Sequence, residues 1–500
     1  MNNHFLQDLV KGKYGRKIAY ADVEEITESN ILKVLGDCIG VFNWNRPIIR
    51  YLWDYKNGDQ PARYRTKVVR DDIVNHIVEN HAYEIVAFKN AQTNGEPIQL
   101  VSLKKEEKVN KGVDRFNDYC RAVNKHEKDI SCGEWTSAVG TGFKCVQRAR
   151  GNDVPFRIAV PTPLNTFVIY SRLTEEPLLA VQDLKDENGQ KYYLCYSETH
   201  EYKIKGGKLV GYVGQDGQEV FSKIHAFGGI PIVEYPNNQD RLSDIELVID
   251  LLDAINNMQS NRMDAIEQFV QSWVKFINCE VDKQTFSEMK MQGALVVKSN
   301  NGTDHKADVD IMTQELNQTE SQVAKDDLWN NALSISAIPN KQGNTGGDTQ
   351  GAVELRNGWD FSKQRAKLKD PYIVGAERRL AKVILKIIEQ EKGVNECPLG
   401  VMDFEITINH SPTDNMQVKV QSLQMLLQAG IHPLIALKTV GLWSDAEKVF
   451  LTSKPYLDVL YKTLEQVEDA QAEEERAKKL LEQQNLDSKA TAKSVVAISI

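Results

Sequence analysis

This chain of 500 residues lacks paired cysteines, long apolar runs and an excess of positive charge. The seven cysteines are odd in number and scattered, and none are spaced as CxxC, so we predict reduced, mostly buried thiols in a cytosolic setting. No stretch approaches the ~18 apolar residues of a membrane-spanning helix. The first residues also lack the charged start and apolar run of a signal peptide. We therefore expect neither a membrane span nor a secretory leader. The net charge of −9 gives no overall positive field for nucleic acid.

Catalytic signatures are also missing. Residues 140–144 contain two glycines and a lysine but not the GxxxxGK[ST] spacing of a phosphate loop, so we interpret them as a turn leading into a strand. His76 and His81 are five residues apart, which is not the i, i+4 spacing that directs two imidazoles at one zinc ion. There is no Gly-x-Ser-x-Gly elbow and no His/Cys cluster with ligand spacing. We therefore expect no enzyme activity, no cofactor and no metal site.

A long amphipathic helix is predicted over residues 241–273. Ser243 and Glu246 form a capping-box pattern at its start. Apolar residues then recur with a spacing of three and four, which indicates one buried stripe. The stripe residues that we expect to pack are Val248, Leu252, Ile255, Ile266 and Phe269. About thirty residues at ~1.5 Å each give roughly 45 Å, so the helix needs partner helices along its length. Such a helix indicates an assembly element.

The same helix carries more acidic than basic residues. The ordinary interpretation is a solvated face. The sharper alternative is an acidic wall that repels DNA and lets a duplex slide past, because a phosphate-binding helix would need the opposite charge.

A second capped helix and a polar loop follow. Residues 274–312 form a mixed insert with a strand expected at 294–298, and the second helix is predicted within 313–338, with Thr319 and Gln322 in another capping-box pattern. Residues 339–351 are rich in glycine and short polar side chains. This loop is either a plain connector or a working loop that touches a polyanion without holding it. The side chains that would touch it are Asn340, Lys341, Gln342, Asn344, Thr345, Asp348 and Thr349.

The remaining pattern predicts an α+β fold rather than a doubly wound sheet, because helices and strands occur in separate runs. Expected helices cover 31–55, interrupted at Pro47, then 71–80 and 113–128. Residues 84–103 suggest a hairpin around Thr93-Asn94-Gly95. Strands are expected from about 133 to 236, and late in the chain we predict a helix over 352–392 bent at Pro371, a strand at 404–408 and short helices at 416–429, 433–440 and 445–453.

The order of these elements and three local strings resemble the portal proteins of tailed bacteriophages, especially those of long-tailed phages of Gram-positive hosts. The strings are Tyr51–Gln60, similar to the family's early Tyr/Gly/Gln string, Asn238–Asn256, similar to its stem-entry helix, and Gly346–Ala352, similar to its loop-to-helix junction. The resemblance covers about residues 30–465.

That resemblance implies a ring, usually of twelve subunits, around a DNA channel. The implied domains are a helical and β-rich wing (1–240), a first stem helix (241–273), a clip (274–312), a second stem helix (313–338), a tunnel loop (339–351), a long kinked helix with a wing strand (352–414), a helical crown (415–465) and a charged C-terminal helix and tail (466–500).

It also implies a non-enzymatic protein at one capsid vertex of the virion, assembled in the host cytoplasm. Double-stranded DNA would pass through the ring without sequence preference during packaging and ejection. The implied protein partners are further copies of the chain, the packaging terminase, head-completion or adaptor proteins, the major capsid protein and a scaffolding protein. The alternatives are another head–tail connector protein and a nucleic-acid enzyme with an unrecognised site.

Overall fold

The computed structural model divides into two compact units, Met1–Pro412 and Thr413–Ile500, and each is described by itself. The structure describes Val10, Gly12 and residues 15–68, 71–104, 106–213, 218–270, 273–277, 308–312, 318–340, 358–410, 416–443 and 446–460. Helices and strands are mixed, which confirms the α+β class.

The first unit contains most of the helices. They are α2 (Ile31–Lys56), α3 (His81–Asn94), α4 (Glu107–Ala122), α5 (Lys125–Val139), α6 (Ile249–Val270), α8 (Gln318–Ile335), α10 (Trp359–Lys367) and α11 (Asp370–Lys392), with a short 3-10 helix at Pro61–Tyr64. Helix α2 is continuous through Pro47, contrary to the predicted interruption. Its residues on both sides of the proline enter hydrophobic cores, so burial outweighs the one missing backbone hydrogen bond.

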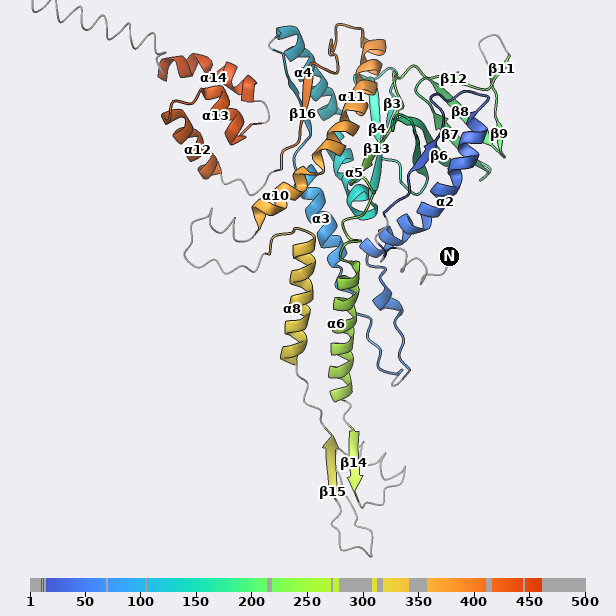
Figure 1. The fold of residues 1–500 in the computed structure, drawn as a ribbon, viewed down its shortest axis with the longest axis vertical. Coiled ribbons are helices and arrows are strands. Elements are labelled where there is room, and N and C mark those ends of the chain that lie inside the picture. The colour runs from blue at the N-terminus through green and yellow to red at the C-terminus, as the bar shows by residue number, and fades with distance from the viewer. Residues whose placement is uncertain are drawn as a thin grey trace, which may run out of the picture. The chain divides into compact units, whose positions relative to one another are not determined.

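Two main sheets form the β-rich part (Figure 1). The larger one has the order β1-β5-β6-β7-β8-β12, with β9 beside β8, and only its β1–β5 pair is parallel among the pairings described. Its strands are β1 (Ala19–Ala21), β5 (Thr166–Ser171), β6 (Pro177–Lys185), β7 (Lys191–Tyr196), β8 (His200–Lys205), β9 (Lys208–Leu209) and β12 (Lys223–Ile224). Helix α2 covers one face of this sheet through a shared core.

The second sheet is antiparallel and has the order β13-β3-β4. Its strands are β3 (Thr141–Arg148), β4 (Phe156–Ala159) and β13 (Ile232–Pro236). Three two-stranded pairs complete the unit: β10 (Tyr212–Val213) with β11 (Glu219–Val220), β14 (Trp273–Ile277) with β15 (Asp308–Met312), and β2 (Gln99–Ser102) with β16 (Phe404–Thr407). The predicted turn into a strand is confirmed, because Gly140 has a φ of 90° and β3 begins at the next residue.

The predicted hairpin over 84–103 is wrong. Residues 81–94 form α3, whose buried residues Ala82, Ile85 and Val86 follow a helical spacing. The side chain of Asn80 accepts a hydrogen bond from the backbone N–H of Tyr83 and so caps the helix. The Asn94-Gly95 string therefore ends a helix instead of turning a hairpin.

The helix predicted over 352–392 is two helices in the described part, α10 and α11, and the segment before Gly358 lies outside it. Pro371 lies in the first turn of α11, where a residue without an N–H leaves no intrahelical hydrogen bond unmade. The chain therefore breaks just before the proline, at Leu368 and Lys369, rather than bending at it. Gly393 follows the last residue of α11, as predicted.

A fully buried charge cluster joins α11 to the rest of the first unit. Lys125 and Asp129 come from α5, Lys144 from β3 and Glu377 from α11. Lys125 lies 2.8 Å from Asp129 and 3.0 Å from Glu377, and Lys144 lies 2.7 Å from Glu377 and also pairs with Asp129. Two positive and two negative charges compensate one another, which is the condition under which buried ions are tolerated. Burial alone would raise the pKa of Glu377, but Lys125 and Lys144 outweigh it and lower the pKa to about 2.

The second unit contains three helices in its described residues: α12 (Met416–Gln428), α13 (Pro433–Val440) and α14 (Ala446–Leu460). Helix α13 has the predicted bounds, with Pro433 at its start and Gly441 after it. Helix α14 continues beyond the predicted end at Ser453 and contains Pro455. None of the helices in the described part of the chain is long and apolar enough to cross a bilayer.

We predict that Glu377→Gln destabilises the first unit by about 3–5 kcal/mol at pH 7, because two buried lysines would then share one carboxylate. The control is Glu389→Gln on the same helix, whose half-exposed pair with Lys386 should contribute less than about 1 kcal/mol. Urea unfolding followed by tryptophan fluorescence measures both changes. The folded-state pKa of Glu377 is depressed, so its stabilisation is present above about pH 4.5 and disappears as the pH falls towards 2. The difference in unfolding free energy between wild type and Glu377→Gln should decrease in that range. Equal losses of stability in the two variants at pH 7 would contradict the prediction.

Candidate functional site

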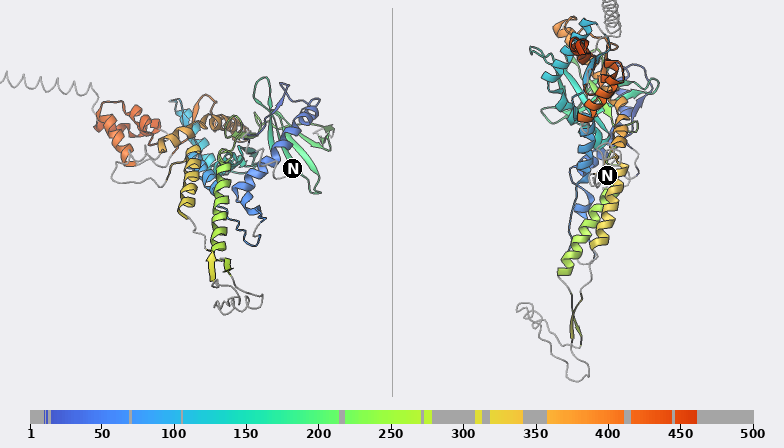
Figure 2. Two further views of the ribbon diagram at one scale, coloured as in Figure 1. Left: turned by 60° about the horizontal axis from the view of Figure 1, so that its bottom comes forward. Right: turned by 90° about the vertical axis from the view of Figure 1, so that its left-hand side faces the viewer.

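The candidate site is the pair of helices α6 and α8, which lie side by side (Figures 1 and 2). The two strands that follow α6 and precede α8, β14 and β15, pair with each other in antiparallel register. Residues 278–307 lie outside the described residues, and so does the strand predicted at 294–298. The described residues thus contain two adjacent helices and a two-stranded antiparallel ribbon from the segment between them.

Helix α6 begins at Ile249, later than the predicted start, and Trp273 belongs to β14 instead of the helix. The predicted capping contact still forms, since the backbone N–H of Ser243 donates to Glu246 over 2.7 Å. It stabilises a turn, however, because the hydroxyl of Ser243 donates to the carbonyl of Ala138 and Glu246 pairs with the buried Arg16. These tertiary contacts hold residues 243–248 out of the helix.

The apolar stripe of α6 divides into two parts. Val248, Leu252 and Ile255 are buried in a core that also contains Ala332 and Leu333 of α8. Ile266, farther along α6, is 39% exposed, and Met263 beside it and Val323 of α8 are also exposed. The side chain of Phe269 lies outside the described residues. The base of the helix pair is thus packed within one chain, whereas its far half presents apolar side chains without a cover from the described residues.

Four of the seven acidic residues of α6 and its entry, Asp244, Glu246, Asp253 and Asp264, are buried, whereas Asp240, Asp250 and Glu267 are exposed. Asp244 accepts hydrogen bonds from Lys369 at 2.7 and 2.9 Å, Asp253 accepts one from the hydroxyl of Tyr55 at 2.9 Å, and Asp264 is buried. Burial would raise the pKa of Asp264, but Lys67, Asn75 and Arg65 outweigh it and lower the pKa. The buried carboxylates therefore stabilise the fold of the first unit.

Residues 71–80, here called the strap, run along α6 in place of the predicted helix. In Figure 1 the strap lies beside α6. Alternate backbone N–H groups of the strap donate to side chains of α6. The bonds run from Asn75 to Asp264 (2.7 Å), from Ile77 to Ser260 (3.0 Å) and from Glu79 to Asn256 (2.8 Å). The acceptors are four residues apart on one face of α6, so they satisfy the extended chain in the way a neighbouring strand would.

Glu79 joins the strap to both helices. Its carboxylate accepts hydrogen bonds from Gln259 of α6, from Lys325 of α8 at 2.7 Å, and from His81 at 3.0 Å. The ring of His81 also stacks on Trp329 of α8, with centroids 3.9 Å apart. These contacts of Glu79 were not predicted from the sequence. The four-residue spacing of Asn256, Ser260 and Asp264 was the available signal for it.

The described residues nearest to the predicted loop on either side contact other parts of the first unit. Ala337 and Ile338 are buried after α8, and Asn340 is half-buried. At the other end, the amide of Gln92 on α3 donates a hydrogen bond of 3.0 Å to the hydroxyl of Ser362 on α10. The other six loop residues lie outside the described residues: Lys341, Gln342, Asn344, Thr345, Asp348 and Thr349.

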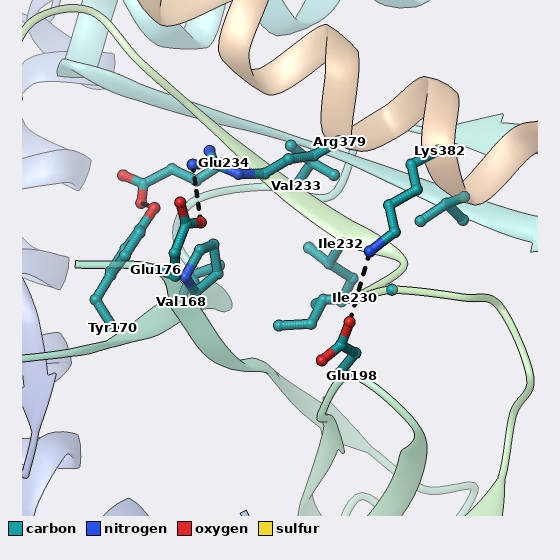
Figure 3. A pocket seen from close by; sticks show the side chains of 13 residues that line it. Val168, Tyr170, Glu176, Glu198, Ile230, Ile232, Val233, Glu234, Arg379 and Lys382 are labelled. Carbon is teal, nitrogen blue, oxygen red and sulfur yellow. Dashed lines mark hydrogen bonds and ion pairs between the residues drawn. The ribbon is translucent and has the colours of Figure 1, made fainter. Parts of the chain in front are cut away.

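A cavity of about 260 Å³ lies between β5, β13 and α11 (Figure 3). Its floor is apolar, and its rim has two ion pairs, Arg379–Glu176 at 3.3 Å and Lys382–Glu198 at 3.5 Å. Glu234 is buried at one end. Burial opposes its ionisation, but Arg241 and hydrogen bonds from Tyr170 and Thr141 outweigh it and lower its pKa. An ionised carboxylate with all its partners in place is a structural group and is not poised to transfer a proton.

The described cysteines and potential metal ligands are likewise not arranged for catalysis. Six cysteines are described, and all are buried free thiols, as predicted; Cys279 lies outside the described residues. Burial raises the pKa of Cys120, Cys132 and Cys145 to about 12, so their thiolates are rare at neutral pH. Within the described residues no group of three or more His, Cys, Asp or Glu could hold a metal ion.

Comparison with known proteins identifies relatives. The family model "Phage portal protein, SPP1 Gp6-like" matches residues 38–480. The portal protein of Bacillus phage SPP1 is 24% identical over 312 residues, which span 57% of this chain and 58% of that protein. Among solved structures, the neck of an empty gene transfer agent particle computed with C6 symmetry aligns with a TM-score of 0.45 and 12% identity, covering 72% of this chain and 90% of that one. The virion of the native particle gives a TM-score of 0.42 and 11% identity, covering 79% and 93%.

We predict that Asp264→Ala releases the strap from α6, because Lys67 and the N–H of Asn75 would lose their carboxylate acceptor and Arg65 would lose one of its acceptors. Unpaired buried donors cost about 1–3 kcal/mol, so amide hydrogen exchange in residues 75–79 should accelerate roughly ten- to hundredfold. The control is Asp326→Ala on the exposed side of α8, whose carboxylate accepts one exposed hydrogen bond, from Gln322 of the same helix. Unchanged amide hydrogen exchange in the strap of the Asp264 variant would show that these hydrogen bonds do not hold the strap on α6.

Proposed function

Because the chain belongs to the family of phage portal proteins of the SPP1 Gp6-like type, we propose that it forms a ring around a DNA channel at one vertex of the capsid. The ring would carry double-stranded DNA during packaging and ejection and would serve as a docking platform. We propose a structural protein without enzyme activity, located in the virion after assembly in the host cytoplasm.

The helix pair carries this proposal. Apolar residues on the far half of α6 and on α8, namely Met263, Ile266 and Val323, are exposed in the single chain. Exposed apolar area in helices that leave the body of the protein favours burial against further copies. A closed ring would provide that cover by a heterologous contact, in which one face of each subunit meets a different face of the next. Twelve subunits is the number that the family resemblance implies.

The domain roles follow from this proposal. Residues 1–240 and 352–414 would form the wing, 241–273 and 313–338 the stem, 274–312 the clip, 415–465 the crown and 466–500 a charged C-terminal helix and tail. The clip would receive the terminase during packaging and head-completion or adaptor proteins afterwards. The wing and crown would contact the major capsid protein and a scaffolding protein. The loop 339–351 would face DNA through the seven polar side chains named above.

Two substitutions on α6 separate folding from ring assembly. Leu252→Asp places a charge in the buried base and should cost several kcal/mol of folding stability. Ile266→Asp changes a side chain that is 39% exposed, so the single chain should fold with little change while rings are lost. Thermal unfolding measures the first effect, and electron microscopy of the purified protein measures the second. Rings that form normally with Ile266→Asp, or a wild-type protein that never forms rings, would contradict the proposal.

Deletion of residues 341–349 tests the tunnel loop. Because the loop would touch DNA and not neighbouring subunits, we expect intact rings but impaired packaging, measured as DNA protected from nuclease. Replacement of the same nine residues by a glycine–serine segment is the control, since it keeps the length and removes the native side chains. Loss of rings on deletion would assign the segment to a subunit contact.

A further inference from the structure

His410 lies between the end of α3 and the start of α11, in the segment that follows β16. Its side chain is only 6% exposed. The ring nitrogen Nδ1 lies 3.1 Å from the backbone carbonyl oxygen of Gln92, which belongs to the last turn of α3. The other ring nitrogen, Nε2, lies 2.8 and 2.9 Å from the two carboxylate oxygens of Asp370, the first residue of α11. One imidazole therefore contacts two helix ends at once.

Both neighbours of the ring are hydrogen-bond acceptors. A carbonyl oxygen and an ionised carboxylate cannot donate, whereas a neutral imidazole has one N–H group and one lone pair. The neutral ring could satisfy one of the two contacts, and its other nitrogen would then present a lone pair to an acceptor. The imidazolium form has two N–H groups and satisfies both contacts. The geometry therefore favours the charged form of His410.

The two helix ends favour the same charge. Carbonyl groups in the last turn of a helix have no intrahelical partner and carry a partial negative charge, which a cation stabilises. A carboxylate is stable at the first residue of a helix, where the partial charge is positive, so Asp370 is well placed to serve as the counter-ion. Lys367 of α10 is the nearby cation that opposes the charge on His410.

These contacts determine how the segment responds to pH. Burial would lower the pKa of His410, but the hydrogen bond and charge of Asp370 and the bond to Gln92 outweigh both burial and Lys367, so the pKa is raised above its ordinary value of 6.5. A raised pKa in the folded state means that the stabilisation is complete below about pH 6.5. It is lost as the pH rises through the folded-state pKa.

We propose that His410 is a pH-dependent clamp, which ties the segment after β16 to the end of α3 and to the start of α11 while both of its ring nitrogens carry a proton. Loss of one proton leaves a lone pair facing an acceptor, so one of the two hydrogen bonds breaks and the segment detaches from that helix. A histidine is suited to this role because its charge changes near neutral pH.

The clamp would also act on α10. The side-chain amide of Gln92 donates to the hydroxyl of Ser362, so the residue of α3 that accepts the bond from His410 also contacts α10. Helix α10 contacts α11 as well. Opening of the clamp should therefore loosen the junction between these helices. The inference concerns the first unit of one chain and does not depend on ring formation.

The first test follows the ring nitrogens by NMR in the full-length protein labelled with ¹⁵N-histidine. His410→Gln identifies the signals of His410 among those of the nine histidines. We expect both nitrogens to be protonated at pH 6.5, with a titration midpoint above that pH. Asp370→Asn should lower the midpoint, because it removes the counter-charge. The control is Asp360→Asn, which changes an exposed carboxylate at the start of α10 and should leave the midpoint unchanged.

The second test measures amide hydrogen exchange of residues 404–410 between pH 6 and 8.5, corrected for the intrinsic pH dependence of exchange. Hydrogen bonds to charged groups contribute about 1.5–3 kcal/mol, so protection of the wild-type segment should fall roughly ten- to hundredfold as His410 loses its proton. Protection in His410→Gln should not depend on pH, because glutamine does not titrate.

The exchange measurement on the wild-type protein remains decisive if a variant does not fold. The proposal is overturned by a neutral His410 at pH 6.5, by a titration midpoint that does not respond to Asp370→Asn, or by wild-type protection that is independent of pH.

Discussion

The first unit depends on the contacts that cover the long helix α6. The main one is the contact with the strap, which forms because two residues of the extended strap advance almost as far as four residues of the helix. Two residues of extended chain advance about 6.6–6.8 Å, and four residues of helix advance about 6 Å. Alternate N–H groups of the strap can therefore reach side chains at every fourth position of α6, at Asn256, Ser260 and Asp264. The mismatch of about 0.7 Å per interval accumulates, so only a few consecutive hydrogen bonds of this kind can form. Short polar acceptors suit it, because they reach a backbone donor without forcing the two segments apart.

Charge compensation is the second constraint on the base of the helix pair. The ionised groups there are arranged in neutral sets, such as Lys369 with Asp244 and Arg16 with Glu246, because an unpaired charge in this interior would be costly. Acidic residues that look like a solvated face in the sequence therefore hold α6 to α5, α11 and the strap.

Particular elements show which kinds of prediction succeed. The α+β class, the turn at Gly140, the bounds of α13 and the buried thiols follow from local signals that the tertiary structure supports. The hairpin at residues 84–103 failed because Asn94-Gly95 is equally suited to end a helix, and the helical spacing of Ala82, Ile85 and Val86 was overlooked. The helix start at Ser243 was placed too early because the capping contact also stabilises a simple turn when tertiary contacts hold the chain.

The sequence by itself determined the family and the presence of a long amphipathic helix with a partner, because apolar periodicity and the order of elements are encoded locally. Only the tertiary structure decided which part of that apolar stripe is buried within the chain, at Leu252 and Ile255, and which part is left exposed, at Ile266. It also decided that the carboxylates of Asp244 and Asp264 face inward, since their partners Lys369 and Asn75 are more than a hundred residues away in the chain. Periodicity defines a face, but the identity of what covers that face depends on long-range contacts.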